Sequence, residues 1–123
     1  MIRPPLVERA LAVDVAAGFE GSLPDEDGAM LHVLAAGRNV GRAAAIGQGT
    51  GVASAWIASA LPPGVPLHTV ERDPGLAAVV ERLLDADDDV HVHVGDWESE
   101  LTPHAPFDLV FVAAEDAVTE IDP

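Results

Sequence analysis

A short apolar segment that runs directly into three alternating glycines constrains the fold of this chain more than any other feature. Residues 43–51 read Ala-Ala-Ala-Ile-Gly-Gln-Gly-Thr-Gly, and apolar residues at helical spacing follow from Val52 to Leu61. Glycine is required where backbone must approach a ligand closely or adopt positive φ angles. The free N–H groups of a helix's first turn favour anionic or polar ligands. The pattern therefore predicts a strand, a turn and a helix N-terminus that together bind a carboxylate, a phosphate or a ribose.

A second strand and helix follow this turn. The apolar run that begins at Leu67 ends on Glu71, and Asp73-Pro74 then begins a helix, with Asp73 as N-cap and Pro74 at the first helical position. In a βαβ nucleotide-binding fold, an acidic residue about twenty positions beyond the glycines accepts hydrogen bonds from ribose hydroxyls. Glu71 fits this role; the alternative interpretation is a solvated residue at the end of a strand.

Two more strands and two N-terminal helices complete the pattern. The candidate strands are Val90 to Val94, which is followed by Gly95-Asp96-Trp97, and Phe107 to Val112, whose nearly continuous apolar run is typical of a buried parallel strand. The candidate helices are Leu6 to Ala17 and Gly28 to Ala36, the second with Gly37 as its C-cap. This order predicts an α/β fold, a Rossmann-like parallel sheet flanked by helices. We expect residues 1–41 to form an N-terminal helical segment and residues 42–123 the ligand-binding core of one compact domain.

These motifs together resemble the class I S-adenosylmethionine-dependent methyltransferases, and most closely the small O-methyltransferases of the catechol and caffeoyl-CoA type. The segments that carry the resemblance are Asp27 to Leu31, Ile46 to Ala58, Thr69 to Pro74, Val94 to Asp96 and Phe107 to Val112. The resemblance extends from about Leu6 to Asp116. It implies a sheet with strand order 3-2-1-4, cut short after the fourth strand of a larger fold.

The resemblance also implies S-adenosylmethionine as the cofactor. In that family the glycine loop passes under the methionyl part of the cofactor, the acid matched by Glu71 holds the ribose, and the acid matched by Asp96 lies beside the adenine amino group. The candidate cofactor-binding residues are therefore Gly47, Gln48, Gly49, Thr50, Gly51, Glu71, Arg72, Asp96 and Trp97. No catalytic residue is assigned, because the sequence shows no convincing general base.

Two positions depart from the family pattern. Ala45 stands where the family carries an acid that helps to hold the amino group of the cofactor, so cofactor binding should be weaker. Ala113 stands where metal-dependent members carry an aspartate, and Glu115 and Asp116 are out of register to replace it. We therefore expect an O-methyltransferase that acts on a small-molecule acceptor without a metal. The alternative is a catalytically inactive methyltransferase-like domain that serves as an interaction module.

The implied strand order places the apolar strand Phe107 to Val112 at an edge of the sheet. An exposed apolar edge favours pairing with another chain. The sequence thus predicts a homo-oligomer through this edge, or a chain truncated from a longer fold.

Composition narrows the remaining function classes. The formal net charge of −15 is unfavourable for nucleic-acid binding, which needs a basic surface. No lysine is present, which excludes a Walker-type phosphate loop and a lysine Schiff base, and no cysteine is present. No signal peptide or membrane-spanning run is evident, so we expect a cytoplasmic protein. An NAD-type fingerprint fits less well, because Val52 stands where its third glycine belongs.

Two other groups of residues could bind metal ions. The aspartates of Asp85 to Asp89 resemble the start of a calcium loop, but Val90 occupies the position that needs glycine, which favours a solvated turn. His91 and His93 share one face of a predicted strand, where such residues more often pack than bind metal. His68 and His104 have no evident partner in the sequence.

Overall fold

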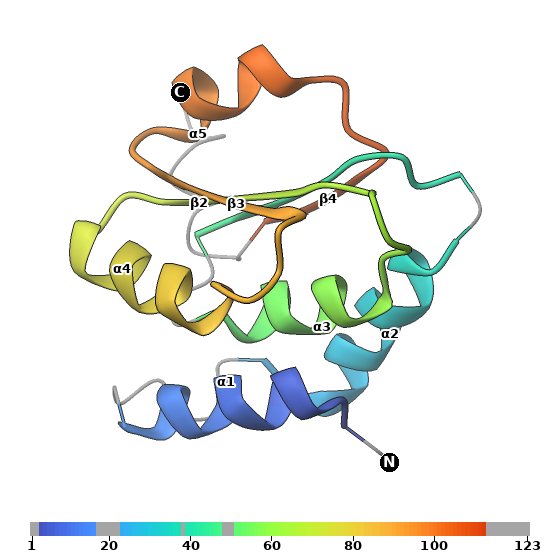
Figure 1. Ribbon diagram of the computed structural model, residues 1–123, viewed down its shortest axis with the longest axis vertical. Helices are drawn as coiled ribbons and strands as arrows, with labels where there is room; N and C mark the ends of the chain where they lie inside the picture. Colours follow the sequence, from blue (N-terminus) through green and yellow to red (C-terminus); the bar gives the residue numbers. More distant parts are fainter. Residues whose placement is uncertain (1–2, 17–22, 38, 48–50, 113–123) are drawn as a thin grey trace.

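The protein is described by a computed structural model that covers residues 3–16, 23–37, 39–47 and 51–112. Its elements are α1 (Pro5–Ala16), α2 (Asp25–Ala35), β1 (Ala43–Ile46), α3 (Val52–Ala60), β2 (Leu67–Glu71), α4 (Pro74–Leu83), β3 (Val90–Val94), α5 (Trp97–Leu101), the 3-10 turn η1 (Thr102–His104) and β4 (Leu109–Val112). The strands form one sheet in the order β3-β2-β1-β4, and every pairing is parallel. The predicted α/β class and strand order are confirmed (Figure 1).

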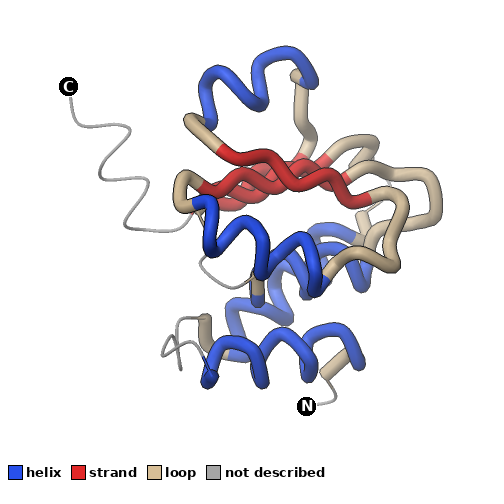
Figure 2. The backbone as a smooth tube through the Cα atoms, turned by 60° about the vertical axis from the view of Figure 1, so that its left-hand side comes forward, coloured by secondary structure: helices blue, strands red, loops and turns tan. Residues whose placement is uncertain are grey.

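The sheet lies between two layers of helix. Helices α3 and α4 pack on one face, whereas α5 and η1 cover the other face (Figures 1 and 2). Helices α1 and α2 both pack against α3, so α1 forms an outer layer beyond it. None of the helices in the described part of the chain is long and apolar enough to cross a membrane.

Strand β1 is the centre of the fold because its four residues are small, apolar and completely covered. Ala43, Ala44 and Ala45 have no exposed surface, and Ile46 is buried as well. Alanine side chains on both faces of a central parallel strand let the flanking helices approach closely. Two clusters of apolar side chains result: Ala43 and Ala45 pack with Ile57 and Leu67 on the α3 face, and Ala44 and Ile46 pack with Val70 and Leu101 on the α5 face.

Several predicted boundaries differ from the structure. Helix α2 begins at Asp25 rather than Gly28, because Asp25, Glu26 and Asp27 place acidic side chains in the first turn, where the helix dipole favours them. The C-cap of α2 is Ala36, in a right-handed conformation, rather than Gly37. Strand β4 begins at Leu109 rather than Phe107.

The late start of β4 has a local cause. The Phe107 side chain packs against the apolar cluster under α5 instead of continuing the strand. The next residue, Asp108, accepts a 2.7 Å hydrogen bond from the Gly41 N–H through its carboxylate and donates its own N–H to the Arg42 carbonyl. These contacts fix the entry to β4 before regular pairing with β1 begins.

Candidate functional site

The two described glycines that flank the turn between β1 and α3 have the backbone geometry that the sequence predicts. Gly47 has φ of +62° and Gly51 has φ of +96°, both in the left-handed region that favours glycine. Gly51 is the N-cap residue of α3, and its carbonyl accepts the first helical hydrogen bond from Ala55. The first turn of α3 is thereby directed at the carboxyl edge of the sheet. Gln48, Gly49 and Thr50, also predicted to bind the cofactor, lie outside the described residues.

Glu71 is the last residue of β2 and is partly buried at the same edge. The Gly47 N–H donates a 2.8 Å hydrogen bond to the carbonyl of Val70, which brings the glycine turn beside the end of β2. The Glu71 carboxylate accepts a hydrogen bond from the Asp73 N–H at 3.3 Å. Asp73 is the N-cap of α4 as predicted, because its carboxylate accepts from the Gly75 N–H, with Pro74 at the start of the helix. The strand end and the helix start therefore hold Glu71 next to the turn.

Asp96 and Trp97 lie one strand further along this edge. Gly95, which precedes them, has φ of +137° and donates its N–H to the Glu71 carbonyl at 3.0 Å. Asp96 is exposed and is the N-cap residue of α5, although its side chain makes no capping hydrogen bond. Trp97 is partly buried and packs against the apolar cluster under α5. The structure thus brings Gly47, Gly51, Glu71 and Asp96 to the ends of three adjacent strands.

Arg72 and Ala45 differ from each other in their burial. Arg72 directly follows β2, and its side chain is exposed to solvent near the carboxyl edge of the sheet. Ala45 is completely buried within β1, where it is paired with Thr69 and Phe111 in the neighbouring strands. A buried methyl group offers no hydrogen-bond acceptor, so nothing at this position replaces the acid of the family pattern. The positions Ala113, Glu115 and Asp116 lie outside the described residues.

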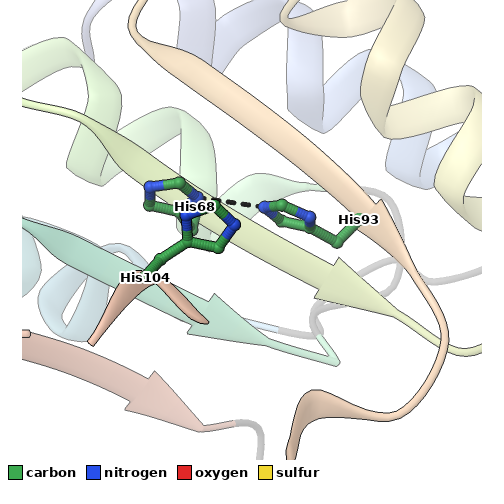
Figure 3. A group of neighbouring side chains, drawn as sticks. All are labelled: His68, His93 and His104. Atoms are coloured by element: carbon green, nitrogen blue, oxygen red, sulfur yellow. Dashed lines mark hydrogen bonds between the residues drawn. The ribbon is translucent and has the colours of Figure 1, made fainter. Parts of the chain in front are cut away.

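A second group of chemically capable side chains lies on the α5 face of the sheet. His68 of β2, His93 of β3 and His104 of η1 each offer a ring nitrogen, and these nitrogens all lie within 4.8 Å of one another (Figure 3). His68 Nδ1 and His93 Nε2 are 3.0 Å apart. The ring of His68 stacks on that of His104, with ring centroids 4.3 Å apart. We call His68, His93 and His104 the histidine cluster.

The histidine cluster corrects the expectation that His68 and His104 have no partner. The pairing of β2 with β3 sets His68 opposite His91 and Val70 opposite His93, so all three histidines share the face that η1 covers. The spacing of His91 and His93 in the sequence indicated only that these two residues share one face of a strand. That His68 and His104 lie beside them depends on the register of two strands and on the path of η1, which no local pattern specifies.

Burial is the largest cause that lowers the pKa of His68, and together with charge repulsion from the neighbouring His104, His91 and His93 it brings that pKa to about 4. Burial lowers the pKa of His93 as well, and the carboxylate of Glu100 opposes that effect. Both imidazoles are therefore neutral near pH 7.

The aspartate-rich segment after α4 forms a capped turn. Asp87 accepts a hydrogen bond from the Asp89 N–H, and Asp89 accepts one from the Gly64 N–H at 2.8 Å. Strand β3 then begins at Val90. These contacts agree with the expected helix-to-strand turn.

Comparisons with known proteins identify the family and the fold of the chain. A protein-family model described as Protein-L-isoaspartate(D-aspartate) O-methyltransferase (PCMT) matches residues 8–121. The O-methyltransferase TomG from Streptomyces achromogenes, solved in complex with SAM, is 28% identical with a TM-score of 0.79, over 96% of this chain and 57% of that chain. An O-methyltransferase from Bacillus cereus in complex with SAH shares the fold at 22% identity and a TM-score of 0.82, over 98% of this chain and 59% of that chain.

A solved protein-L-isoaspartate O-methyltransferase is less similar in structure. It is 20% identical with a TM-score of 0.59, over 69% of this chain and 27% of that chain. A search of curated proteins gave no significant match. The chain spans less than two thirds of the length of the solved methyltransferases to which it is similar.

Proposed function

The chain belongs to the protein-L-isoaspartate(D-aspartate) O-methyltransferase family, and on that premise we propose that it binds S-adenosylmethionine at the carboxyl edge of its sheet. We further propose that the bound cofactor serves methyl transfer to an oxygen atom of a small-molecule acceptor. The observation that carries the proposal is the meeting of Gly51, Glu71 and Asp96 at the ends of three adjacent parallel strands.

The residues present fit this cofactor. Gly47 and Gly51 have positive φ angles on either side of the turn, a backbone conformation at this edge that residues other than glycine rarely adopt. The carboxylate of Glu71, partly buried at the end of β2, can accept hydrogen bonds from ribose hydroxyls. The exposed carboxylate of Asp96 can accept one from an adenine amino group, and the indole of Trp97 offers an apolar surface next to it.

The chemistry that the cofactor supplies when bound is an activated methyl group on a sulfonium sulfur. The protein then has to hold the acceptor oxygen in line with that methyl group. Methyl transfer therefore depends on positioning more than on acid–base chemistry. A general base would assist if the acceptor is a hydroxyl group. Because Ala45 provides no carboxylate for the amino group of the cofactor, we expect affinity about ten- to a hundredfold below that of a site with the acid.

The choice of a small-molecule acceptor rests on structural similarity. The match to TomG covers nearly the whole chain, whereas the match to the isoaspartate enzyme covers about two thirds of it at a lower TM-score. The acceptor pocket itself is not assigned, since the chain spans little more than half of TomG.

Titration with S-adenosylhomocysteine, S-adenosylmethionine and NAD tests the proposal. We expect both sulfur compounds to raise the melting temperature by mass action, and NAD to leave it unchanged. Isothermal titration calorimetry should give one site per chain. A response to NAD alone would overturn the assignment. A response to none of the three ligands would instead favour the non-catalytic interaction module.

A further inference from the structure

We propose that the histidine cluster is a binding site for a divalent transition metal ion of the Zn²⁺ type, separate from the cofactor edge. Three imidazole nitrogens from β2, β3 and η1 converge within 4.8 Å under the α5 layer (Figure 3). This inference does not depend on the proposed methyltransferase activity.

The spacing of the nitrogens is close to what tetrahedral coordination requires. Zn–N bonds of about 2.0–2.1 Å place two ligand nitrogens roughly 3.3 Å apart. His68 Nδ1 and His93 Nε2 are 3.0 Å apart, so one ion can contact both after a small outward shift. A ring nitrogen of His104 lies within 4.8 Å of a ring nitrogen of each of the other two histidines, and His104 becomes the third ligand when its ring rotates out of its stacking on His68.

The second nitrogen of His93 faces a carboxylate. His93 Nδ1 is 3.9 Å from Glu100 Oε1, while His93 Nε2 faces the cluster. A metal-bound histidine commonly directs its other ring N–H at a carboxylate, which fixes the tautomer and makes the ligand nitrogen more basic. Glu100 of α5 is therefore placed as the supporting residue, and it also supplies a negative charge next to the site.

The surroundings further define the site. His68 is 6% exposed and His93 is partly buried, so the ligands are held by packing rather than free in solvent. His91, which is exposed, stacks against His68 with ring centroids 4.9 Å apart. The guanidinium of Arg42 donates a hydrogen bond to the His104 carbonyl. The positive charge of Arg42 disfavours a bound cation, and the negative charge of the Glu100 carboxylate offsets that effect.

The chemistry of the donor set selects the ion. Neutral imidazoles favour Zn²⁺, Co²⁺, Ni²⁺ and Cu²⁺, whereas Mg²⁺ and Ca²⁺ prefer oxygen ligands. Three protein ligands leave the fourth coordination position for water. An ion bound here would link β2 and β3 to η1, the turn that leads into β4.

The test uses the 123-residue chain without a tag, titrated with Co²⁺ and Zn²⁺ in excess Mg²⁺ so that the exposed aspartates are already occupied. We expect one tight site, a visible Co²⁺ absorption spectrum of a tetrahedral nitrogen-ligated ion, and displacement of Co²⁺ by Zn²⁺. X-ray absorption of the Zn²⁺ form should show three imidazole ligands. This measurement needs no variant, so it remains decisive if a substitution impairs folding.

Two matched pairs of variants locate the ion. His104→Asn should weaken Zn²⁺ binding by at least about 100-fold, whereas His32→Asn, on α2 across the sheet, should not change it. Glu100→Gln should weaken binding by about 10–100-fold, whereas Glu98→Gln on the exposed side of α5 should not. The proposal is wrong if neither ion binds, if X-ray absorption shows oxygen ligands only, or if His104→Asn folds and binds Zn²⁺ like the wild type.

Discussion

The N–H of Gly95 donates a 3.0 Å hydrogen bond to the carbonyl of Glu71, which joins the end of β3 to the end of β2. Because Asp96 follows Gly95 directly, this bond sets the two acidic side chains at one edge of the sheet. Gly95 has φ of +137°, a conformation that other residues rarely adopt, so the chain turns away from β3 at this point. The relationship explains how two acids far apart in the sequence can belong to one ligand site.

Glu71→Ala should weaken the binding of S-adenosylhomocysteine by about 1–3 kcal/mol, because the ribose would lose its carboxylate acceptor. Calorimetric titration measures the loss. Glu81→Ala, an exposed position on α4, is the matched control and should retain wild-type affinity. An unchanged affinity in Glu71→Ala would mean that the ribose is held by another residue.

Gly51→Ala should lower the free energy of unfolding by more than Gly64→Ala does. Both glycines have similar positive φ angles, +96° and +85°, so each alanine carries a conformational cost of about 1–2 kcal/mol. Only at Gly51 would the new Cβ also meet a neighbour, 3.3 Å from Leu83, whereas the Cβ at Gly64 meets nothing within 4 Å. Urea denaturation of both variants gives the difference; equal losses would show that the core beside Gly51 adapts without cost.

Gly28→Ala should destabilise the protein although alanine is the better helix former. A Cβ at Gly28 would lie 2.1 Å from Trp56 Nε1, so the buried indole must move. Overpacking of this kind costs about 1–3 kcal/mol and outweighs the gain in helix propensity of about 1 kcal/mol. Val33→Ala on the exposed side of α2 is the control and should change the free energy of unfolding by less than about 0.5 kcal/mol. A stabilised Gly28→Ala variant would contradict the packing of α2 on α3.

The free energy of unfolding of the metal-free protein should fall as the pH is lowered from about 6.5 to about 4. Burial and charge repulsion from the neighbouring histidines lower the pKa of His68 to about 4 in the folded protein, while the unfolded chain titrates near 6.5. In this window the unfolded state binds a proton at His68 that the folded state does not, so acid favours unfolding. Denaturant unfolding at several pH values gives the free energy of unfolding as a function of pH. Its slope should be smaller for His68→Asn than for the wild type. His32→Asn, which removes an imidazole outside the cluster, is the control; equal slopes in wild type and His68→Asn would refute the prediction.

Self-association should occur through the edge strand β4, as its apolar sequence predicts. Val110 and Val112 are 49% and 37% exposed, and within the described part of the chain β4 pairs only with β1. An unpaired apolar edge is a template for a second chain. Light scattering should show a dimer or larger assembly that Val110→Lys weakens and Val94→Lys, on the opposite edge strand β3, does not. A wild-type protein that stays monomeric at high concentration would contradict this prediction.

The elements that formed as predicted are those whose signals are local. The N-cap at Asp73, the proline after it and the apolar face of α4 lie within a few residues of one another, so the sequence specifies that helix almost completely. The same holds for the glycine turn, whose positive φ angles at Gly47 and Gly51 no other residue accepts readily. The predictions were wrong at boundaries such as the start of β4. There Phe107 belongs to an apolar, strand-like segment but packs against the cluster under α5 instead.

The sequence by itself determined the parallel α/β fold, because repeated strand–helix units permit few arrangements. The strand order 3-2-1-4 followed from the resemblance to the methyltransferases, and the structure confirms it. Only the tertiary structure decided that His68, His93 and His104 meet. Their meeting depends on the register between β2 and β3 and on the path of η1 across the sheet. Register follows from the summed packing of whole faces, and a shift by one residue would turn the histidine side chains to the opposite face.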